Sequence, residues 1–408
     1  MKIQTLHKPA LTLLVATLSL SSANADTLFN FKNKNPVDPN ISLYDYTEAT
    51  SSFKDTYLNF DMNAGKNRDD AQTYYNARLG LDARRIFSSP SRDLELQFNG
   101  IGNTGRSGSA GAERNSSYQL STSLTADNYF RPNSKGAFWF GSLGIKADDA
   151  FDDLDTRLTA GLGYGRVTNV TPMAKAIRLI EELRGRGALS AAPTKDTYRK
   201  IANIISRKSE YQSKYGGKAK FYQQHWIGDI EQALGKTLSA TGVLAARDVL
   251  IDENISTRRY GWKVRAGLSY VGTDFSGLTN NPGVLLNGEY HRPLSNRTQF
   301  SEEAEITTTF DDTNAYTFDN TMSLTHEVDD RIDWINRWNL NYNHSAVDED
   351  DVTTNTLSST FAYEIGNSLD LTLTGLVKNS EGNDTVSAGE VADGTDRQLN
   401  LGLRYRLR

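Results

Sequence analysis

The last ten residues of the chain alternate between apolar and polar side chains. Leu or Tyr occupies every odd position from 399 to 407, and polar residues or glycine occupy the positions between them. Because successive side chains of a β-strand point to opposite faces, this segment is a strand with one apolar and one polar face. The same period of two residues recurs along most of the chain. Repeated segments of this kind are typical of a transmembrane β-barrel, so we predict an all-β, antiparallel barrel in a membrane.

The alternating segments predict about fourteen strands, with about 12 or 16 as the alternatives. The first six lie within 53–169 and the other eight within 256–408. They are expected near 53–63, 73–85, 93–102, 116–128, 136–147, 156–167, 258–273, 283–291, 297–310, 315–327, 331–344, 354–365, 369–379 and 397–408. Every second connection is a short turn, such as 88–92 and 366–368, and the connections between them are generally longer. Outer-membrane barrels have short periplasmic turns and long external loops, which is the same pattern.

One connection that should be a short turn instead has a helical period. In residues 170–255 apolar side chains recur every three or four positions, with Thr171 as the expected N-cap and Pro172 at the first helical position. We therefore expect an α-helical insert, placed in the periplasm. It contains 14 basic and 9 acidic residues, a net charge of +5, in a chain whose formal charge is −5.

The N-terminal residues predict export across the inner membrane. Residues 1–25 combine a positively charged start, a short apolar stretch and the small-residue site Ala23-Asn24-Ala25, as in a cleaved signal peptide. Residues 26–52 are rich in Asn and Pro and have no clear period. They are expected to form a periplasmic tail or to enter the barrel lumen, and we favour the tail because chain ends are usually loose.

The sequence contains no clear sign of an enzyme, a cofactor or a metal site. It has no cysteine, and no two of its five histidines have the spacing of metal ligands. Asn343-His344-Ser345 invites comparison with outer-membrane lipid hydrolases, which use His and Ser on the barrel wall. Adjacent residues of a strand point to opposite faces, however, so a hydrolase is the weaker interpretation. We expect no catalytic, cofactor-binding or metal-binding residue.

The polar faces of the expected strands carry charges of both signs, which we predict to line the lumen. These residues are Arg78, Asp82, Arg84, Arg157, Arg265, Glu303, Glu305, Asp319, Arg337, Glu364 and Arg404. In a pore they would set the electric field, whereas in a closed barrel they would pair with one another across strands. The sequence leaves both interpretations open.

The signal peptide and the terminal pattern Leu399-x-Leu401-x-Leu403-x-Tyr405-x-Leu407 resemble Gram-negative outer-membrane β-barrel proteins. The resemblance covers roughly 53–408 apart from the insert, and the chain ends in Arg408 where this class usually has an aromatic residue. It implies a location in the cell outer membrane and contact with its lipid and lipopolysaccharide. It also implies insertion by the barrel assembly machinery, which in this class reads the final strand. No nucleic-acid partner is expected.

Two functions follow from the sequence. The first is a porin-like channel for the transport of polar solutes, since a barrel of this size can hold an aqueous lumen. The alternative is a non-conducting structural or assembly anchor that tethers the helical insert to an envelope partner. The insert itself is expected to be a lid or a docking site for a periplasmic protein or peptidoglycan. Docking candidates are Lys200, Lys208, Lys214, Phe221, Tyr222 and Trp226, although these aromatic residues also suit the core of the insert.

Overall fold

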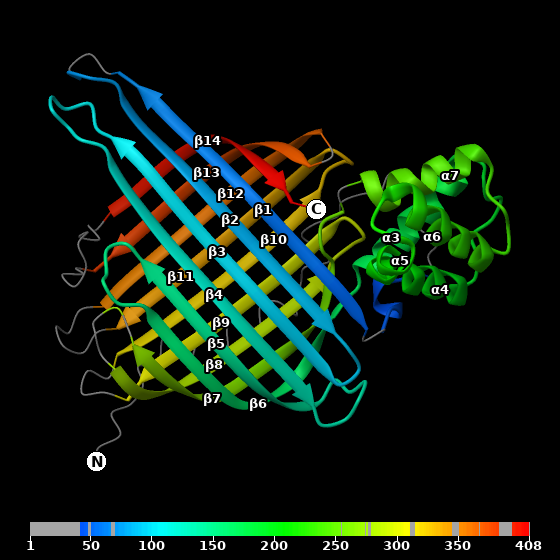
Figure 1. Cartoon of the computed structure of the whole chain (residues 1–408), viewed down its shortest axis with the longest axis horizontal. Coiled ribbons are helices and arrows are strands. Elements are labelled where there is room, and N and C mark those ends of the chain that lie inside the picture. Colours follow the sequence, from blue (N-terminus) through cyan, green and yellow to red (C-terminus); the bar gives the residue numbers. More distant parts are fainter. Residues whose placement is uncertain are drawn as a thin grey trace. The chain divides into compact units, whose positions relative to one another are not determined.

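The strands of the chain close into one antiparallel barrel, in which consecutive strands are neighbours and the first pairs with the last (Figure 1). A computed structural model describes residues 41–47, 50–66, 70–253, 255–273, 275, 279–310, 315–344, 351–366, 368–382 and 394–407. The strands are β1 (Ser51–Gly65), β2 (Tyr74–Ser88), β3 (Arg92–Arg106), β4 (Asn115–Tyr129), β5 (Ala137–Asp148), β6 (Asp155–Asn169), β7 (Arg259–Thr273), β8 (Thr279–Pro293), β9 (Thr298–Thr309), β10 (Tyr316–Glu327), β11 (Ile332–His344), β12 (Asp351–Gly366), β13 (Leu369–Glu381) and β14 (Gly394–Arg406). The predicted antiparallel barrel of fourteen strands is confirmed. The predicted signal peptide lies outside the described residues.

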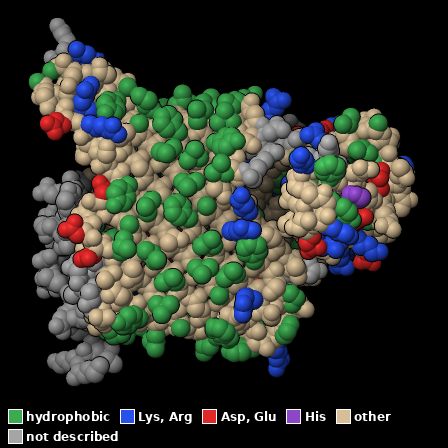
Figure 2. Space-filling model, in the orientation of Figure 1, with side chains coloured by type: hydrophobic (Ala, Val, Ile, Leu, Met, Phe, Trp, Pro, Cys, Tyr) green, Lys and Arg blue, Asp and Glu red, His purple; other side chains and the backbone are tan. Residues whose placement is uncertain are grey.

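Apolar side chains cover the outward face of the strands. Leu158 and Leu162 of β6 are 57% and 63% exposed, and Leu399 and Leu401 of β14 are 74% and 62% exposed. Figure 2 shows hydrophobic side chains spread over the whole strand surface that faces the viewer. An apolar surface of this extent is costly in water and favourable in a bilayer. The period of two residues in the sequence therefore reflects side chains that point alternately toward the lipid and toward the barrel interior.

Aromatic residues gather on the outward face toward the strand ends at the short turns, at the connection from β6 to the helices and at the C-terminal end of β14. They are Phe87, Phe130, Trp139, Tyr164, Tyr363 and Tyr405, all of them exposed. Aromatic girdles of this kind mark the membrane interface of outer-membrane barrels, because the ring is apolar while its edge or hydroxyl tolerates water.

The pairing that closes the barrel is short. The register of β1 and β14 runs from Tyr57–Arg406 to Asp61–Gly402, which is five pairs. In contrast, β1 and β2 pair over all fifteen residues of each strand, from Ser51–Ser88 to Gly65–Tyr74. Beyond Asp61, the described residues of β1 have no partner on β14. The closing seam between β1 and β14 is thus paired over a shorter length than the junction between β1 and β2.

The predicted insert is helical. Its helices are α3 (Thr171–Gly185), α4 (Lys195–Ser206), α5 (Lys208–Tyr215), α6 (Ala219–Leu234) and α7 (Ala240–Arg247), and a π-helical turn, η2 (Asp248–Asp252), follows them. Arg207 lies between α4 and α5 and separates the two helices. Thr171 is not the N-cap of α3, because the helix starts at this residue and the Asn169 side chain accepts a hydrogen bond from its backbone N at 3.0 Å. None of the described helices is long and apolar enough to cross a membrane.

The chain divides into two compact units. The described parts of 41–47, 167–262 and 288–304 form one, which we call the helical unit, and the other strand residues form the barrel unit. The core of the helical unit contains Leu179 and Ile180 of α3, Ile201 of α4 and Trp226 of α6, all almost fully buried. The indole N–H of Trp226 donates to the Ile204 carbonyl at 2.8 Å, which satisfies its polar atom inside the core.

The segment that precedes β1 belongs in part to the helical unit. Residues 41–47 include a short 3-10 turn, η1 (Leu43–Asp45), and bury Ile41, Leu43 and Tyr46 in the helical core. Asp45 pairs with Lys195 of α4 at 2.9 Å. The expectation of a loose tail or lumenal segment over 26–52 is therefore wrong for 41–47, because three apolar side chains gain burial there. The rest of that segment up to residue 40 lies outside the described residues.

Candidate functional site: the interior of the barrel

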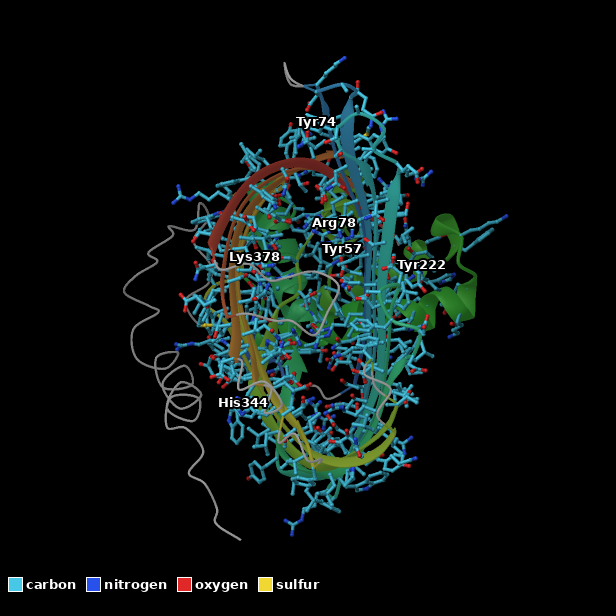
Figure 3. All side chains as sticks on the ribbon, turned by 90° about the vertical axis from the view of Figure 1, so that its left-hand side faces the viewer. Tyr57, Tyr74, Arg78, Tyr222, His344 and Lys378 are labelled. Carbon is cyan, nitrogen blue, oxygen red and sulfur yellow. The ribbon has the colours of Figure 1, made fainter. Side chains whose placement is uncertain are left out.

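The inward face of β2 carries three of the predicted lumen residues. Leu79 and Leu81 point outward, so Arg78, Asp82 and Arg84 point inward, and Figure 3 shows Arg78 inside the ring of strands. Arg84 Nε lies 2.5 Å from Glu95 Oε1 on β3. Asp82 accepts hydrogen bonds from the amides of Asn59 on β1 and Asn99 on β3.

A second polar group joins strands next to the closing seam. Arg404 of β14 lies 2.6 Å from Asp370 of β13 and 3.7 Å from Asp333 of β11. Arg406 donates to the Tyr57 hydroxyl of β1 at 2.5 Å. Its guanidinium also lies over the Tyr57 ring, 5.1 Å from the centroid. These contacts tie the last strand to both of its neighbours from the inside.

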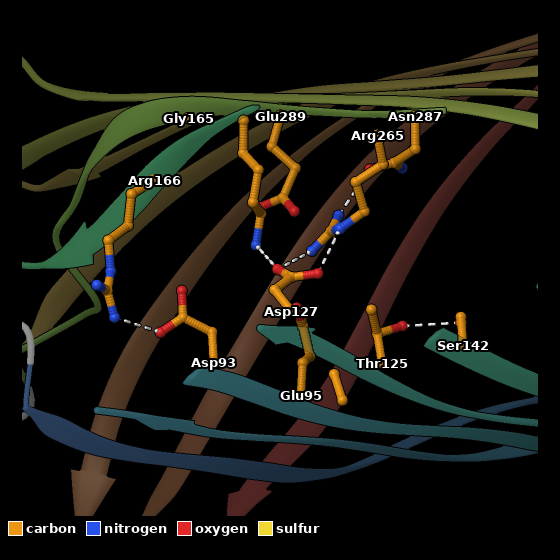
Figure 4. A network of polar contacts seen from close by, with 12 residues as sticks. Asp93, Glu95, Thr125, Asp127, Ser142, Gly165, Arg166, Arg265, Asn287 and Glu289 are labelled. Carbon is orange, nitrogen blue, oxygen red and sulfur yellow. Dashed lines mark hydrogen bonds and ion pairs between the residues drawn. The ribbon is translucent and has the colours of Figure 1, made fainter. Parts of the chain in front are cut away.

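A group of buried interior charges surrounds Asp127 (Figure 4). Its carboxylate accepts from Lys263 Nζ at 2.8 Å and from Arg265 at 2.9 and 2.8 Å. Arg265 also donates to Asn287 Oδ1 at 2.8 Å. The predicted lumen residue Arg265 thus holds a bidentate ion pair, a geometry that compensates for the loss of water around both charges. We call Asp127, Lys263 and Arg265 the Asp127 cluster.

Glycines allow β4 and β7 to approach, although β5 and β6 lie between them in the barrel. A Cβ on Gly161 of β6 would overlap the Ala266 carbonyl oxygen of β7, and one on Gly267 would lie 2.8 Å from the Phe140 ring. Phe138 and Phe140 of β5 are fully buried against this corner. The wall therefore turns sharply here, which brings the side chains of β7 to Asp127.

A second buried ion pair depends on a change of face within β6. Gly165 has a φ of 104°, a conformation that favours glycine, and after it Arg166 points inward. Arg166 Nη2 lies 2.9 Å from Asp93 of β3, and its guanidinium stacks 4.3 Å from the Tyr129 ring centroid. The Tyr129 hydroxyl donates to the other oxygen of Asp93 at 3.0 Å.

The other predicted lumen residues are spread along the inward faces. Glu303 pairs with Arg259 at 2.9 Å, Glu305 accepts from Asn287 at 3.3 Å, and Asp319 accepts from Asn341 at 2.6 Å. Arg157 and Glu364 are half-buried, whereas Arg337 is exposed. The structure does not gather these residues into one site.

The predicted docking residues of the insert differ in exposure. Tyr222 and Trp226 are 5% and 1% exposed and belong to the core, so their side chains present no docking surface. Phe221 is 48% exposed. Lys200 and Lys214 are exposed, and Lys208 is half-buried with its Nζ 5.8 Å from the Trp226 ring centroid.

Two carboxyl groups of the helical unit have shifted pKa values. Burial raises the pKa of Glu181 in α3, although the nearby guanidinium groups of Arg178 and Arg297 oppose the shift. Burial also acts to raise the pKa of Asp45, but the hydrogen bonds from Lys195 and the Ser42 backbone, together with the charges of Lys195 and Arg199, outweigh burial, and the pKa falls below its ordinary value.

A closed ring of strands, an apolar outer face, aromatic residues near the strand ends and a charged interior define a transmembrane β-barrel of the outer-membrane type. A family model described as a protein of unknown function, DUF481, matches residues 252–365, which span β7 to β12. No curated protein matches the chain in sequence.

The chain is also similar to solved barrel structures. OprB of Pseudomonas putida is 8% identical with a TM-score of 0.33, and the match covers 88% of this chain and 93% of that one. An anion-selective porin from Comamonas acidovorans is 11% identical with a TM-score of 0.32 and coverages of 87% and 100%. An outer membrane channel from Pseudomonas putida F1 is 10% identical with a TM-score of 0.30 and coverages of 92% and 100%. Similarity at this level assigns no function to the chain.

Proposed function

We propose that this protein is a channel that lets small polar solutes cross the outer membrane. The observation that supports the proposal most directly is the exposure of Arg337. Arg337 lies in the middle of β11 between outward-facing neighbours such as Trp338, so its side chain points into the barrel. It is nevertheless exposed to solvent, as is Arg78 on the inward face of β2. Solvent therefore reaches these interior charges, as an aqueous lumen requires.

The distribution of interior charge supports a pathway for solutes of weak net charge. The Asp127 cluster, the Asp93–Arg166 pair and the Arg404–Asp370 pair all combine opposite signs. Such pairs cancel much of each other's field, in contrast to the single-sign rings that select strongly among ions. We infer that polar, neutral solutes such as short oligomers of sugars are suitable permeants.

Liposome swelling tests this function. Liposomes that contain the purified protein should swell in isotonic sugar solutions, faster with monosaccharides than with larger oligosaccharides. Protein-free liposomes provide the baseline. If the rates equal that baseline for every sugar, the channel function is wrong and the non-conducting anchor is the better account.

We also propose that the helical unit docks on an acidic envelope component, for which peptidoglycan is the candidate. Lys200, Lys214 and Phe221 are exposed on consecutive helices and support this proposal. Purified sacculi should sediment the wild-type protein and should sediment the double variant Lys200→Glu/Lys214→Glu much less. Wild-type protein that stays in the supernatant at low salt would contradict docking on peptidoglycan. A lid, the alternative role of this unit, predicts no binding to sacculi.

A further inference from the structure

Three side chains of metal-ligating type lie together on the hairpin formed by β8 and β9. They are Glu289 and His291 of β8 and Glu303 of β9, and each offers one ligand atom within 4.8 Å of the other two. All three lie within the helical unit as the chain divides. The sequence had suggested no metal ligand, and of the three only Glu303 was among the predicted lumen residues.

The register of the hairpin brings these residues to one face. Glu289 and His291 are two positions apart on the same strand, so their side chains point the same way. At the turn, the Leu294 backbone N donates to the Thr298 carbonyl at 2.9 Å. This bond places Leu294 opposite Thr298. In an antiparallel pair, the residues that lie equally far from this point along the two strands are also opposite each other, so Glu289 lies opposite Glu303. A local hairpin therefore assembles the whole group without any distant element.

The distances within the group suit a shared ion better than hydrogen bonds. His291 Nε2 lies 3.4 Å from Glu289 Oε2 and 3.7 Å from Glu303 Oε1. The first contact is a long hydrogen bond, beyond the usual range of N–H···O bonds, and the second is too long to be a hydrogen bond. Two ligands of one tetrahedral ion, each bound at about 2.0–2.2 Å, are separated by roughly 3.3–3.6 Å. The observed separations are close to that edge length.

Burial adds a second argument for a cation at this place. The side chains of His291 and Glu289 are 0% and 7% exposed, and His291 Nδ1 is a buried atom without a hydrogen-bond partner among the described residues. Arg259 pairs with the Glu303 carboxylate at 2.9 Å, and the buried His291 ring lies against both carboxylates. The Glu303 side chain remains 35% exposed, which leaves a route by which an ion can enter.

The turn of the hairpin is held firmly from the helical side. The Asn296 carbonyl accepts from Arg178 Nη2 of α3 and from Arg258 Nε, each at 3.1 Å. Arg178 is itself paired with Glu253 at 2.6 Å. Fixing the turn fixes the register and hence the positions of the three ligand atoms, which lowers the entropy lost when an ion binds.

We propose that Glu289, His291 and Glu303 form a binding site for a divalent transition-metal ion of the Zn²⁺ type. One imidazole with two carboxylates suits zinc and its neighbours, whereas Mg²⁺ and Ca²⁺ prefer sites made of oxygen alone. With three protein ligands, a fourth position stays open to water or a solute.

Titration calorimetry with ZnCl₂ on the untagged, full-length protein in detergent tests the site. One saturable site is expected. His291→Ala and Glu289→Gln should each lower the affinity by at least ~100-fold, since even changes beyond the ligands typically cost 10–100-fold. Glu95→Gln is the matched control, because Glu95, like Glu303, is an interior carboxylate paired with an arginine. It should bind Zn²⁺ as the wild type does, and heat-modifiable migration checks that each variant is folded.

X-ray absorption of the Zn²⁺-loaded wild-type protein needs no variant. It should show a single imidazole ligand together with oxygen ligands at about 2.0–2.2 Å. The proposal is overturned by a wild-type titration without a saturable site, by unchanged affinity in folded His291→Ala protein, or by a spectrum with no imidazole or with more than one.

Discussion

Asp127 of β4 and Arg265 of β7 share two hydrogen bonds, of 2.9 and 2.8 Å, although two strands separate them in the barrel. Lys263 adds a third contact to the same carboxylate at 2.8 Å. All three side chains are buried. The cluster therefore links β4 to β7 across the corner of the barrel. We expect its removal to lower the stability of the barrel strongly.

The substitution Asp127→Asn should destabilise the barrel by about 3–5 kcal/mol, because it leaves two buried cations without their anion. Equilibrium unfolding in urea, followed by Trp fluorescence in lipid vesicles, measures the change. In the triple variant Asp127→Leu/Lys263→Met/Arg265→Met all three charges are absent, and most of the stability should return. A triple variant less stable than Asp127→Asn would contradict the assignment of the loss to unpaired charge.

The close approach of β6 and β7 at Gly161 should tolerate no added side chain at this position. Gly161→Ala places a Cβ where the Ala266 carbonyl oxygen lies, so β6 and β7 cannot close as they do here. We expect the folded, heat-modifiable form to be lost. Gly141→Ala is the control, since nothing lies within 4 Å of its added Cβ, and it should fold normally. Normal migration of Gly161→Ala would show that the wall does not turn sharply at this point.

The helical unit should lose stability as pH rises through the pKa of Glu181. Burial raises the folded-state pKa of this carboxyl above its ordinary value of 4.5. The protonated form is therefore favoured by folding, so the contribution is complete below the ordinary pKa and is lost at higher pH. Thermal unfolding monitored by helical circular dichroism between acid and neutral pH should show this slope. The slope should be smaller in Glu181→Gln, and an identical slope in both proteins would contradict the assignment.

The segment before β1 should stabilise the helical unit. Leu43 is 6% exposed within the helical core, so Leu43→Ala should cost about 2–5 kcal/mol and speed proteolysis of the helices. Leu244→Ala, at a position 56% exposed, is the matched control and should change little. Equal effects of the two substitutions would mean that residues 41–47 do not pack as described.

The closing seam can be examined with engineered cysteines, since the chain has none of its own. Leu58 and Tyr405 are register partners on β1 and β14, so a cysteine pair at these positions should form a disulfide under mild oxidation. Phe60 and Leu403 are the last register pair on the same face; Met62 and Leu401 would follow them, but the register ends at Asp61–Gly402. A cysteine pair at Met62 and Leu401 should remain reduced. Efficient crosslinking at this pair would show that the seam continues to close beyond Asp61.

The sequence predicted the barrel because alternation is a property of each strand alone. The strand count, the short turns and the inward direction of Arg78 or Arg404 all follow from that local period. The Asp127 cluster could not be predicted in this way, since it requires that β4 and β7 meet across a corner. Arg166 was missed for a related reason: Gly165 reverses the face of the strand, and a period of two assumes no such reversal. The burial of Ile41 and Leu43 depends on a partner surface more than 120 residues away in the sequence.

The central claim, an aqueous lumen lined by interior charges, is tested most directly by the reversal potential of single channels in planar bilayers under a salt gradient. Replacing both exposed interior arginines, in Arg78→Glu/Arg337→Glu, should shift the reversal potential toward cation selectivity, because fixed charge in a pore attracts the opposite ion. Arg85→Glu is the control, since Arg85 follows Arg84 on the opposite, outward face of β2 and is exposed there. The account predicts conductance in all three proteins and a shift only in the double variant. Absence of conductance in the wild type, or the same reversal potential in all three, would contradict it.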